Sequence, residues 1–114
     1  MPVDMAKFMN TVGDDWDLAV EVMGLYLADA PTHMEAIQKA LADKDAPQIH
    51  ESAHSLKGAS GVFGDVGIAR LAKRMEELGK NGTLKQADAL FKEMQDALAD
   101  LSGQLHAAMK RNKP

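Results

Sequence analysis

The chain has 114 residues, a length that fits one domain, so we expect residues 1–114 to form a single unit. It contains no cysteine, which excludes disulfides, thiolate zinc sites and cysteine nucleophiles. The net charge of −4 is unevenly spread, because residues 1–53 carry a charge of −7 and residues 54–82 a charge of +2. An acidic total without an arginine-rich stripe argues against nucleic-acid binding.

No stretch has the length and apolar character of a membrane span, and the first residues lack the basic segment and apolar run of a signal peptide. The sequence therefore predicts a cytoplasmic protein without a membrane partner, and we expect a monomer. The initial Met1 and a set of helices sufficient for a whole bundle favour a free-standing chain.

Helical periodicity dominates the chain, and no segment alternates in the manner of a strand. A short N-terminal helix around residues 4–9 is expected to cover one end of the fold. From Trp16 to Leu41 apolar residues recur every three or four positions, and Pro31 inside this run predicts a kink or the start of a second helix.

Capping residues divide the rest of the chain. Asp45 is predicted to cap one helix, and Gly64-Asp65 to end it and cap the next, which Gly79 and Asn81-Gly82 close. Thr83 and Gln86 resemble a capping box at the start of the last helix. The predicted long helices cover residues 15–42, 46–63, 65–79 and 83–109.

Short loops between long amphipathic helices imply an up-down order. The predicted fold class is therefore all-α, an antiparallel up-down four-helix bundle with a short N-terminal helix. The polar tail over residues 110–114 is expected to fray.

The helix predicted over 46–63 carries the most functional information. On a helical wheel of about 100° per residue, His54 points away from the core side. The core side is formed by Ile49, Ala53, Leu56, Ser60 and Phe63. The residues that surround His54 on the exposed side are His50, Lys57, Gly58 and Gly61.

The two glycines on this exposed side require a reason, because each costs about 1 kcal/mol relative to alanine inside a helix. Gly58 and Gly61 remove side chains beside His54, which clears space for another protein to approach the imidazole. Lys57 places a cation about one turn after His54 on the same side. The alternative is a surface histidine on a helix that the glycines merely fray or kink.

The spacing His54, Leu56, Lys57, Gly58, Ser60, Phe63 and Gly64 resembles the signature of the histidine-containing phosphotransfer (HPt) domain family of bacterial multistep phosphorelays. That signature has a histidine, an aliphatic residue at +2, lysine at +3, glycine at +4, a small residue at +6, an apolar residue at +9 and glycine at +10. All seven positions match, and the resemblance is specific over about residues 43–82.

The resemblance implies a phosphorelay intermediate that accepts a phosphoryl group on His54 from the phospho-aspartate of a receiver domain and passes it to another receiver. Lys57 would neighbour the phosphoryl group, and His50, Gly58 and Gly61 would contact the receiver. The implied partners are response-regulator receiver domains and a hybrid sensor histidine kinase. Such a chain is a carrier without kinase activity, and we expect no cofactor or metal of its own, because Mg²⁺ belongs to the receiver.

Glu76, on the next helix, is a candidate to accept a hydrogen bond from Nδ1–H of His54 and so to fix its tautomer. The wheel does not decide which flank of that helix faces His54. An ordinary exposed carboxylate is the alternative reading of Glu76.

A second motif competes for the same residues, since His50-Glu51-x-x-His54 also matches the HExxH pattern of zinc metallopeptidases. Such an enzyme needs a third zinc ligand and a substrate cleft. Here the third ligand would have to be Glu76 or Glu77, because His33 and His106 are remote in sequence. A non-catalytic helical interaction module is the remaining alternative.

Overall fold

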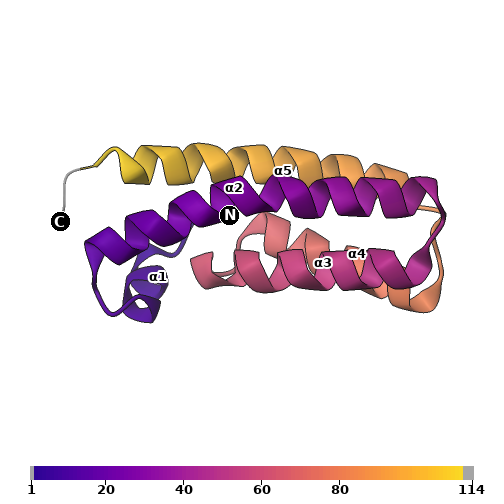
Figure 1. The fold of residues 1–114 in the computed structure, drawn as a ribbon, viewed down its shortest axis with the longest axis horizontal. Helices are drawn as coiled ribbons and strands as arrows, with labels where there is room; N and C mark the ends of the chain where they lie inside the picture. The colour runs from indigo at the N-terminus through magenta and orange to yellow at the C-terminus, as the bar shows by residue number, and fades with distance from the viewer. Residues whose placement is uncertain (1, 112–114) are drawn as a thin grey trace.

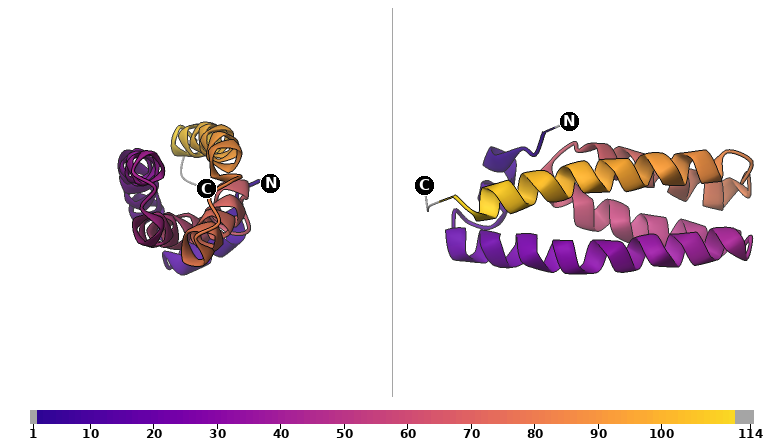
Figure 2. Two further views of the ribbon diagram at one scale, coloured as in Figure 1. Left: turned by 90° about the vertical axis from the view of Figure 1, so that its right-hand side faces the viewer. Right: turned by 90° about the horizontal axis from the view of Figure 1, so that it is seen from above.

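The computed structural model describes residues 2–111, and every regular element within them is helical. The elements in chain order are α1 (Met5–Thr11), α2 (Trp16–Ala42), α3 (Ala46–Ser60), the 3₁₀ turn η1 (Gly61–Phe63), α4 (Gly67–Asn81) and α5 (Ala87–Met109). Helices α2 to α5 run along the length of the molecule, joined by short connections (Figure 1), and occupy four corners when viewed end-on (Figure 2). The predicted antiparallel four-helix bundle with a short N-terminal helix is confirmed.

Aspartate side chains cap the N-termini of three of the helices. The carboxylates of Asp4, Asp15 and Asp45 each accept a hydrogen bond from the backbone N–H three residues later, at 3.0, 3.1 and 3.2 Å. These bonds satisfy N–H groups that have no partner inside the helix. Helix α2 continues unbroken through Pro31, so the proline does not open a second helix.

The passage from α3 to α4 differs from the prediction. The α-helix ends at Ser60, and the last three residues of the predicted segment form η1 instead. Gly64 turns the chain at φ 98°, and a Cβ there would lie 2.8 Å from the Cβ of Asp4. Asp65 does not cap α4, because its carboxylate pairs with the guanidinium of Arg70, at 2.7 Å from Nε. Helix α4 therefore begins at Gly67, two residues later than predicted.

The predicted capping box at Thr83 and Gln86 is wrong. The backbone N–H of Thr83 donates to the carbonyl of Leu78 at 3.1 Å, across Gly82 in the left-handed conformation at φ 68°. Thr83 therefore belongs to the closing turn of α4, and α5 begins only at Ala87, without a side-chain cap. The end of α5 at Met109 agrees with the prediction, and residues 112–114 of the predicted fraying tail lie outside the described residues.

Gly79 was predicted to close α4, but it lies inside the helix, which continues to Asn81. Its position is buried against α3, where backbone atoms fill the space that a Cβ would need. The residue that closes α4 is Gly82, because a left-handed conformation is accessible to glycine at little cost.

The core side of the predicted helix over 46–63 was predicted correctly, because its four wheel residues in α3 and Phe63 in η1 are all fully buried. Phe63 lies at the centre of an aromatic group, with its ring centroid 4.9 Å from that of Phe8 on α1 and 5.0 Å from that of Tyr26 on α2. The Tyr26 hydroxyl and the Ser60 hydroxyl are 2.7 Å apart in this core. Burial raises the pKa of Tyr26 above its ordinary value, although the bond to Ser60 lowers it in part.

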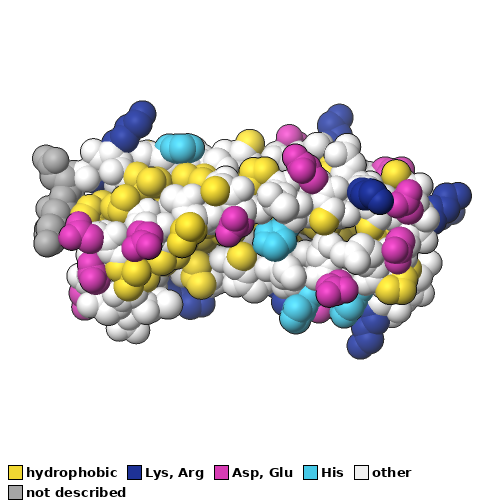
Figure 3. Space-filling view, viewed as in Figure 1, with side chains coloured by type: hydrophobic (Ala, Val, Ile, Leu, Met, Phe, Trp, Pro, Cys, Tyr) yellow, Lys and Arg dark blue, Asp and Glu magenta, His cyan; other side chains and the backbone are white. Residues whose placement is uncertain are grey.

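Hydrophobic side chains gather toward the end of the molecule where α1 lies, and histidine side chains are scattered over the same face (Figure 3). Leu18 and Leu25, both on α2, are the exposed large hydrophobic side chains among the described residues. None of the helices within residues 2–111 combines the length and apolar character needed to cross a membrane.

The Tyr26–Ser60 pair gives a test of the core. Tyr26→Phe should leave a buried hydroxyl without its partner and lower the free energy of unfolding by about 1–3 kcal/mol. Ser60→Ala should have a similar effect, and the double variant should lose less than the sum of the two single losses, because neither hydroxyl then remains unpaired. Urea unfolding of the four proteins measures the coupling. Strictly additive losses would contradict this account.

Candidate functional site

His54 lies on the exposed side of α3, with 65% of its side chain accessible to solvent. Its Nδ1 is 2.9 Å from Oε1 of Glu76 on α4. Because an ionised carboxylate only accepts hydrogen bonds, Nδ1 carries the ring proton and donates a hydrogen bond to Glu76. In the neutral ring this leaves the lone pair on Nε2, and no other residue in 2–111 forms a hydrogen bond with the His54 ring.

Glu76 bridges two residues of α3. Its Oε2 is 2.7 Å from Nζ of Lys57, while its Oε1 accepts from His54. Only 14% of the Glu76 side chain is exposed, whereas the Lys57 side chain is 33% exposed. Lys57, whose Nζ lies 2.7 Å from Oε2, lowers the pKa of Glu76 below its ordinary value, against the opposing effect of burial, and the bond from His54 lowers it further. Glu76 therefore remains a carboxylate at neutral pH.

His50 lies one turn before His54 and is half-buried between α3 and α4. Its Nδ1 is 3.2 Å from the backbone carbonyl oxygen of Glu76, and the ring donates this bond because a carbonyl only accepts. The rings of His50 and His54 are stacked, with their centroids 6.3 Å apart and their planes inclined by 22°. Glu76 thus receives three polar contacts from α3.

Gly58, four residues after His54 on α3, is exposed, and Gly61, the first residue of η1, is half-buried. A Cβ at either position would meet no heavy atom within 4 Å beyond its own helix backbone and chain neighbours. Packing against another helix therefore does not explain either glycine. The surface beside the imidazole is free of side-chain bulk at both positions.

A shallow hollow of about 200 Å³ lies next to this group, between α3 and α4. Three lysines, two glutamates and one histidine line it, so that the lysines outnumber the carboxylates: His50, Lys57, Lys73, Glu76, Glu77 and Lys80. A hollow with this balance of charge favours an anionic group or an acidic partner surface.

The zinc-site alternative lacks its ligands. Within residues 2–111, no three His, Asp or Glu side chains are grouped so as to hold a metal ion. Glu76, one of the two residues considered as the third ligand, is instead paired with Lys57 and His54. His50 is turned toward the Glu76 carbonyl.

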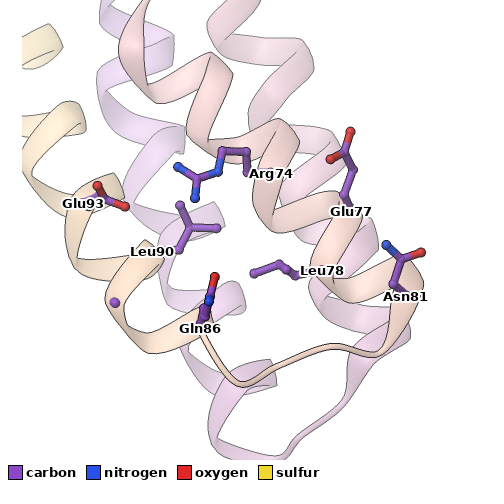
Figure 4. A pocket seen from close by; sticks show the side chains of 8 residues that line it. Arg74, Glu77, Leu78, Asn81, Gln86, Leu90 and Glu93 are labelled. Carbon is purple, nitrogen blue, oxygen red and sulfur yellow. The ribbon is translucent and has the colours of Figure 1, made fainter.

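A larger hollow, of about 340 Å³, lies elsewhere, between the end of α4 and the start of α5. In Figure 4 the side chain of Arg74 points toward α5, near Leu90, whereas Glu77 and Asn81 stand at the opposite rim. None of the residues predicted for the phosphotransfer site lines this hollow, although Glu77, a candidate ligand of the alternative zinc site, does. It adds nothing to the chemistry at His54.

The helical wheel indicated the exposed side of α3 but missed two features of the site. One is the hydrogen bond of His50 to the Glu76 carbonyl, which joins backbone and side chain across two helices. The other is the close approach of α3 and α4 at Gly79. A glycine two residues before Asn81-Gly82 fits a helix terminus equally well, so its spacing did not distinguish the two roles.

Two solved structures share this architecture. The crystal structure of histidine-containing phosphotransfer protein B from Pseudomonas aeruginosa superimposes with a TM-score of 0.89, at 24% identity and over 96% of each chain. The HPT domain of a sensor hybrid histidine kinase from Shewanella superimposes with a TM-score of 0.77, at 22% identity, over 98% of this chain and 97% of that one. At these identities the likeness shows the fold.

The sequence comparisons identify the family. The multistep phosphorelay regulator 1 of Schizosaccharomyces pombe is 29% identical over 79 residues, which are 69% of this chain and 26% of that protein. The chain therefore matches only about a quarter of the length of this curated relative. The model of the Hpt domain matches residues 21–104, which include α3, α4 and all the residues around His54. The chain belongs to the Hpt domain family.

Proposed function

We propose that this chain is a phosphorelay intermediate that accepts a phosphoryl group on Nε2 of His54 from the phospho-aspartate of one receiver domain and passes it to another. The observation that carries the proposal is the state of the His54 ring. Its Nδ1 is held by a carboxylate, and its Nε2 lies on an exposed helix face bordered by two glycines.

In the proposed step, the lone pair of Nε2 attacks the phosphorus of the aspartyl phosphate. A P–N bond forms, the P–O bond to the aspartate breaks, and the aspartate leaves as a carboxylate. The ring keeps its proton on Nδ1 and becomes cationic, with the ionised Glu76 at 2.9 Å as its counter-charge. Transfer to the second receiver reverses these bonds and restores the neutral ring.

Glu76 and Lys57 support this step differently. Glu76 fixes the tautomer that presents Nε2 as the nucleophile, and it stabilises the positive charge that develops on the ring. Lys57 holds the second oxygen of Glu76 and, with a third of its side chain exposed, can also reach a phosphoryl group on Nε2.

The receiver is proposed to dock on the exposed face of α3, over Gly58 and Gly61 and the exposed edge of His50. The receiver would supply the aspartate and Mg²⁺, so this chain acts as a carrier without kinase activity of its own. A hybrid sensor histidine kinase is the proposed source of the phosphoryl group, because the similar Shewanella domain belongs to such a kinase.

The direct test of the proposal is to incubate the chain with a phosphorylated receiver and to assay for acid-labile, alkali-stable label. His54→Gln should abolish labelling and leave the protein folded, because the side chain is exposed. His106→Gln, also at an exposed helical histidine, is the matched control and should label normally. Full labelling of the His54→Gln protein would overturn the proposal.

Lys57→Ala should slow transfer or shorten the life of the phosphohistidine without preventing labelling. A hydrogen bond to a charged group contributes about 1.5–3 kcal/mol, and the partial exposure of Lys57 should bring the effect below this range, to less than about tenfold in rate. Lys92→Ala, at an exposed lysine of α5, is the control. Equal transfer rates and phosphohistidine half-lives in the two variants would show that Lys57 takes no part.

Gly58→Arg should impair labelling by a phosphorylated receiver but not labelling by phosphoramidate, a small donor that needs no docking surface. The protein should be as stable as the wild type or up to about 1 kcal/mol more stable, because glycine is a poor helix former and the added side chain meets open space. Gly103→Arg introduces the same side chain at an equally open glycine of α5 and should not affect labelling. Receiver labelling unimpaired by Gly58→Arg would remove the docking argument.

Glu76 should give the site a characteristic pH dependence. Its folded-state pKa lies below the ordinary value of 4.5, so its ion pairs stabilise the fold fully above that value. This contribution is lost as the pH falls through the folded-state pKa. Glu76→Gln should therefore reduce the fall in unfolding free energy on acidification, as measured by urea unfolding over a pH series. Glu77→Gln, at the exposed neighbour, should retain the wild-type fall, and identical curves for both variants would contradict this role.

A further inference from the structure

We infer that the contact between α3 and α4 at His50 and Gly79 positions Glu76 for its bond with His54, which makes His50 and Gly79 positioning residues of the site. The consequence for phosphoryl transfer rests on the proposed function. The positioning itself concerns the tautomer of His54, which can be measured without any phosphoryl donor.

The first observation is that two histidines of α3 bind the same residue of α4. His54 donates to the side chain of Glu76, and His50 donates to its backbone carbonyl at 3.2 Å. The backbone bond fixes the place of the helix turn from which the Glu76 carboxylate projects. Because the His50 ring is half-buried and bonded across the helix pair, its role extends beyond contact with a receiver.

The second observation is the space at Gly79. A Cβ there would lie 2.5 Å from the backbone nitrogen of His50, 3.0 Å from its Cα and 2.9 Å from the carbonyl oxygen of Ala46. These are backbone atoms of α3, so they cannot move aside as the end of a flexible side chain would. Any other residue at position 79 would force the two helices apart at His50.

The two contacts lie at adjacent levels of the helix pair. Helices α3 and α4 are antiparallel, so four residues forward on α3, from His50 to His54, correspond to about one turn back on α4, from Gly79 to Glu76. The backbone contact is therefore one turn from the bond between His54 and Glu76. A separation of the helices at Gly79 would lengthen the 2.9 Å distance on which the His54 tautomer depends.

A comparison of His50→Ala with His50→Asn tests the backbone bond. Nitrogen NMR of the His54 ring at alkaline pH, where imidazoles are neutral, reports the share of rings with the proton on Nδ1. His50→Ala should lower this share and slow labelling by phosphoramidate by about two- to tenfold, the range expected for one hydrogen bond. His50→Asn should restore both, because its amide can donate from nearly the position of the imidazole Nδ1. A wild-type tautomer share in His50→Ala would overturn the inference.

The pair Gly79→Ala and Gly103→Ala tests the close approach. Gly103→Ala fills open space on α5 and should raise the melting temperature while leaving the His54 spectrum unchanged. Gly79→Ala should lower the melting temperature and shift the tautomer share in the same direction as His50→Ala. Equal stability of the two alanine variants, with wild-type His54 signals in both, would overturn the role of Gly79. If Gly79→Ala does not fold, the crowding is shown and the His50 variants decide the positioning.

The two proposals fail in different ways. If wild-type His54 accepts no label from receivers or phosphoramidate, the proposed function is wrong, although the NMR comparison still tests the positioning. If labelling of His54 occurs but the tautomer share is the same in His50→Ala, His50→Asn and the wild type, the positioning is wrong and the proposed function stands.

Discussion

The carboxylate of Glu76 crosses from α4 to α3 and is the one acidic group on which the polar arrangement around His54 depends. Each of its two oxygens has a separate task, because Oε1 accepts from His54 and Oε2 pairs with Lys57. Lys57 lowers the pKa of Glu76 and so favours the ionised carboxylate, which can only accept a hydrogen bond from Nδ1. Removal of either partner would therefore alter the environment of the other, although Lys57 and His54 share no hydrogen bond.

The same pair of helices uses glycine for two opposite purposes. At Gly79 the missing side chain lets two backbones come closer than any Cβ would allow, inside the protein. At Gly58 and Gly61 the missing side chains leave space on the outside, where the structure places nothing. The His54 imidazole therefore lies between the close α3–α4 contact on one side and an open surface on the other. The proposed transfer between two proteins requires both, because the ring must be held in place and must be accessible to the partner.

The charges of the bundle fit this division. The negative net charge is concentrated in the first 53 positions, whereas the hollow between α3 and α4 is lined by Lys57, Lys73 and Lys80 together with Glu76 and Glu77. A dianionic phosphoryl group, or the acidic surface that presents it, would meet a locally cationic rim on a protein whose net charge is −4. On the face shown in Figure 3, the hydrophobic side chains gather toward the end where α1 lies.

The sequence by itself determined the number and order of the helices, the buried side of α3 and the exposed position of His54, because these follow from apolar periodicity and from residues within one turn. The positions predicted for the starts of α4 and α5 were wrong, because Asp65 pairs with Arg70 and Thr83 belongs to the turn that closes α4. In both cases the polar group had two local hydrogen-bonding options of similar strength, and the sequence did not distinguish them. Only the tertiary structure decided that Glu76 faces His54 and that Gly79 is a contact. Both depend on how α3 and α4 are rotated about their axes and how far apart they lie. Packing along the whole length of the two helices sets these quantities, and the apolar periodicity of either sequence segment does not reveal them.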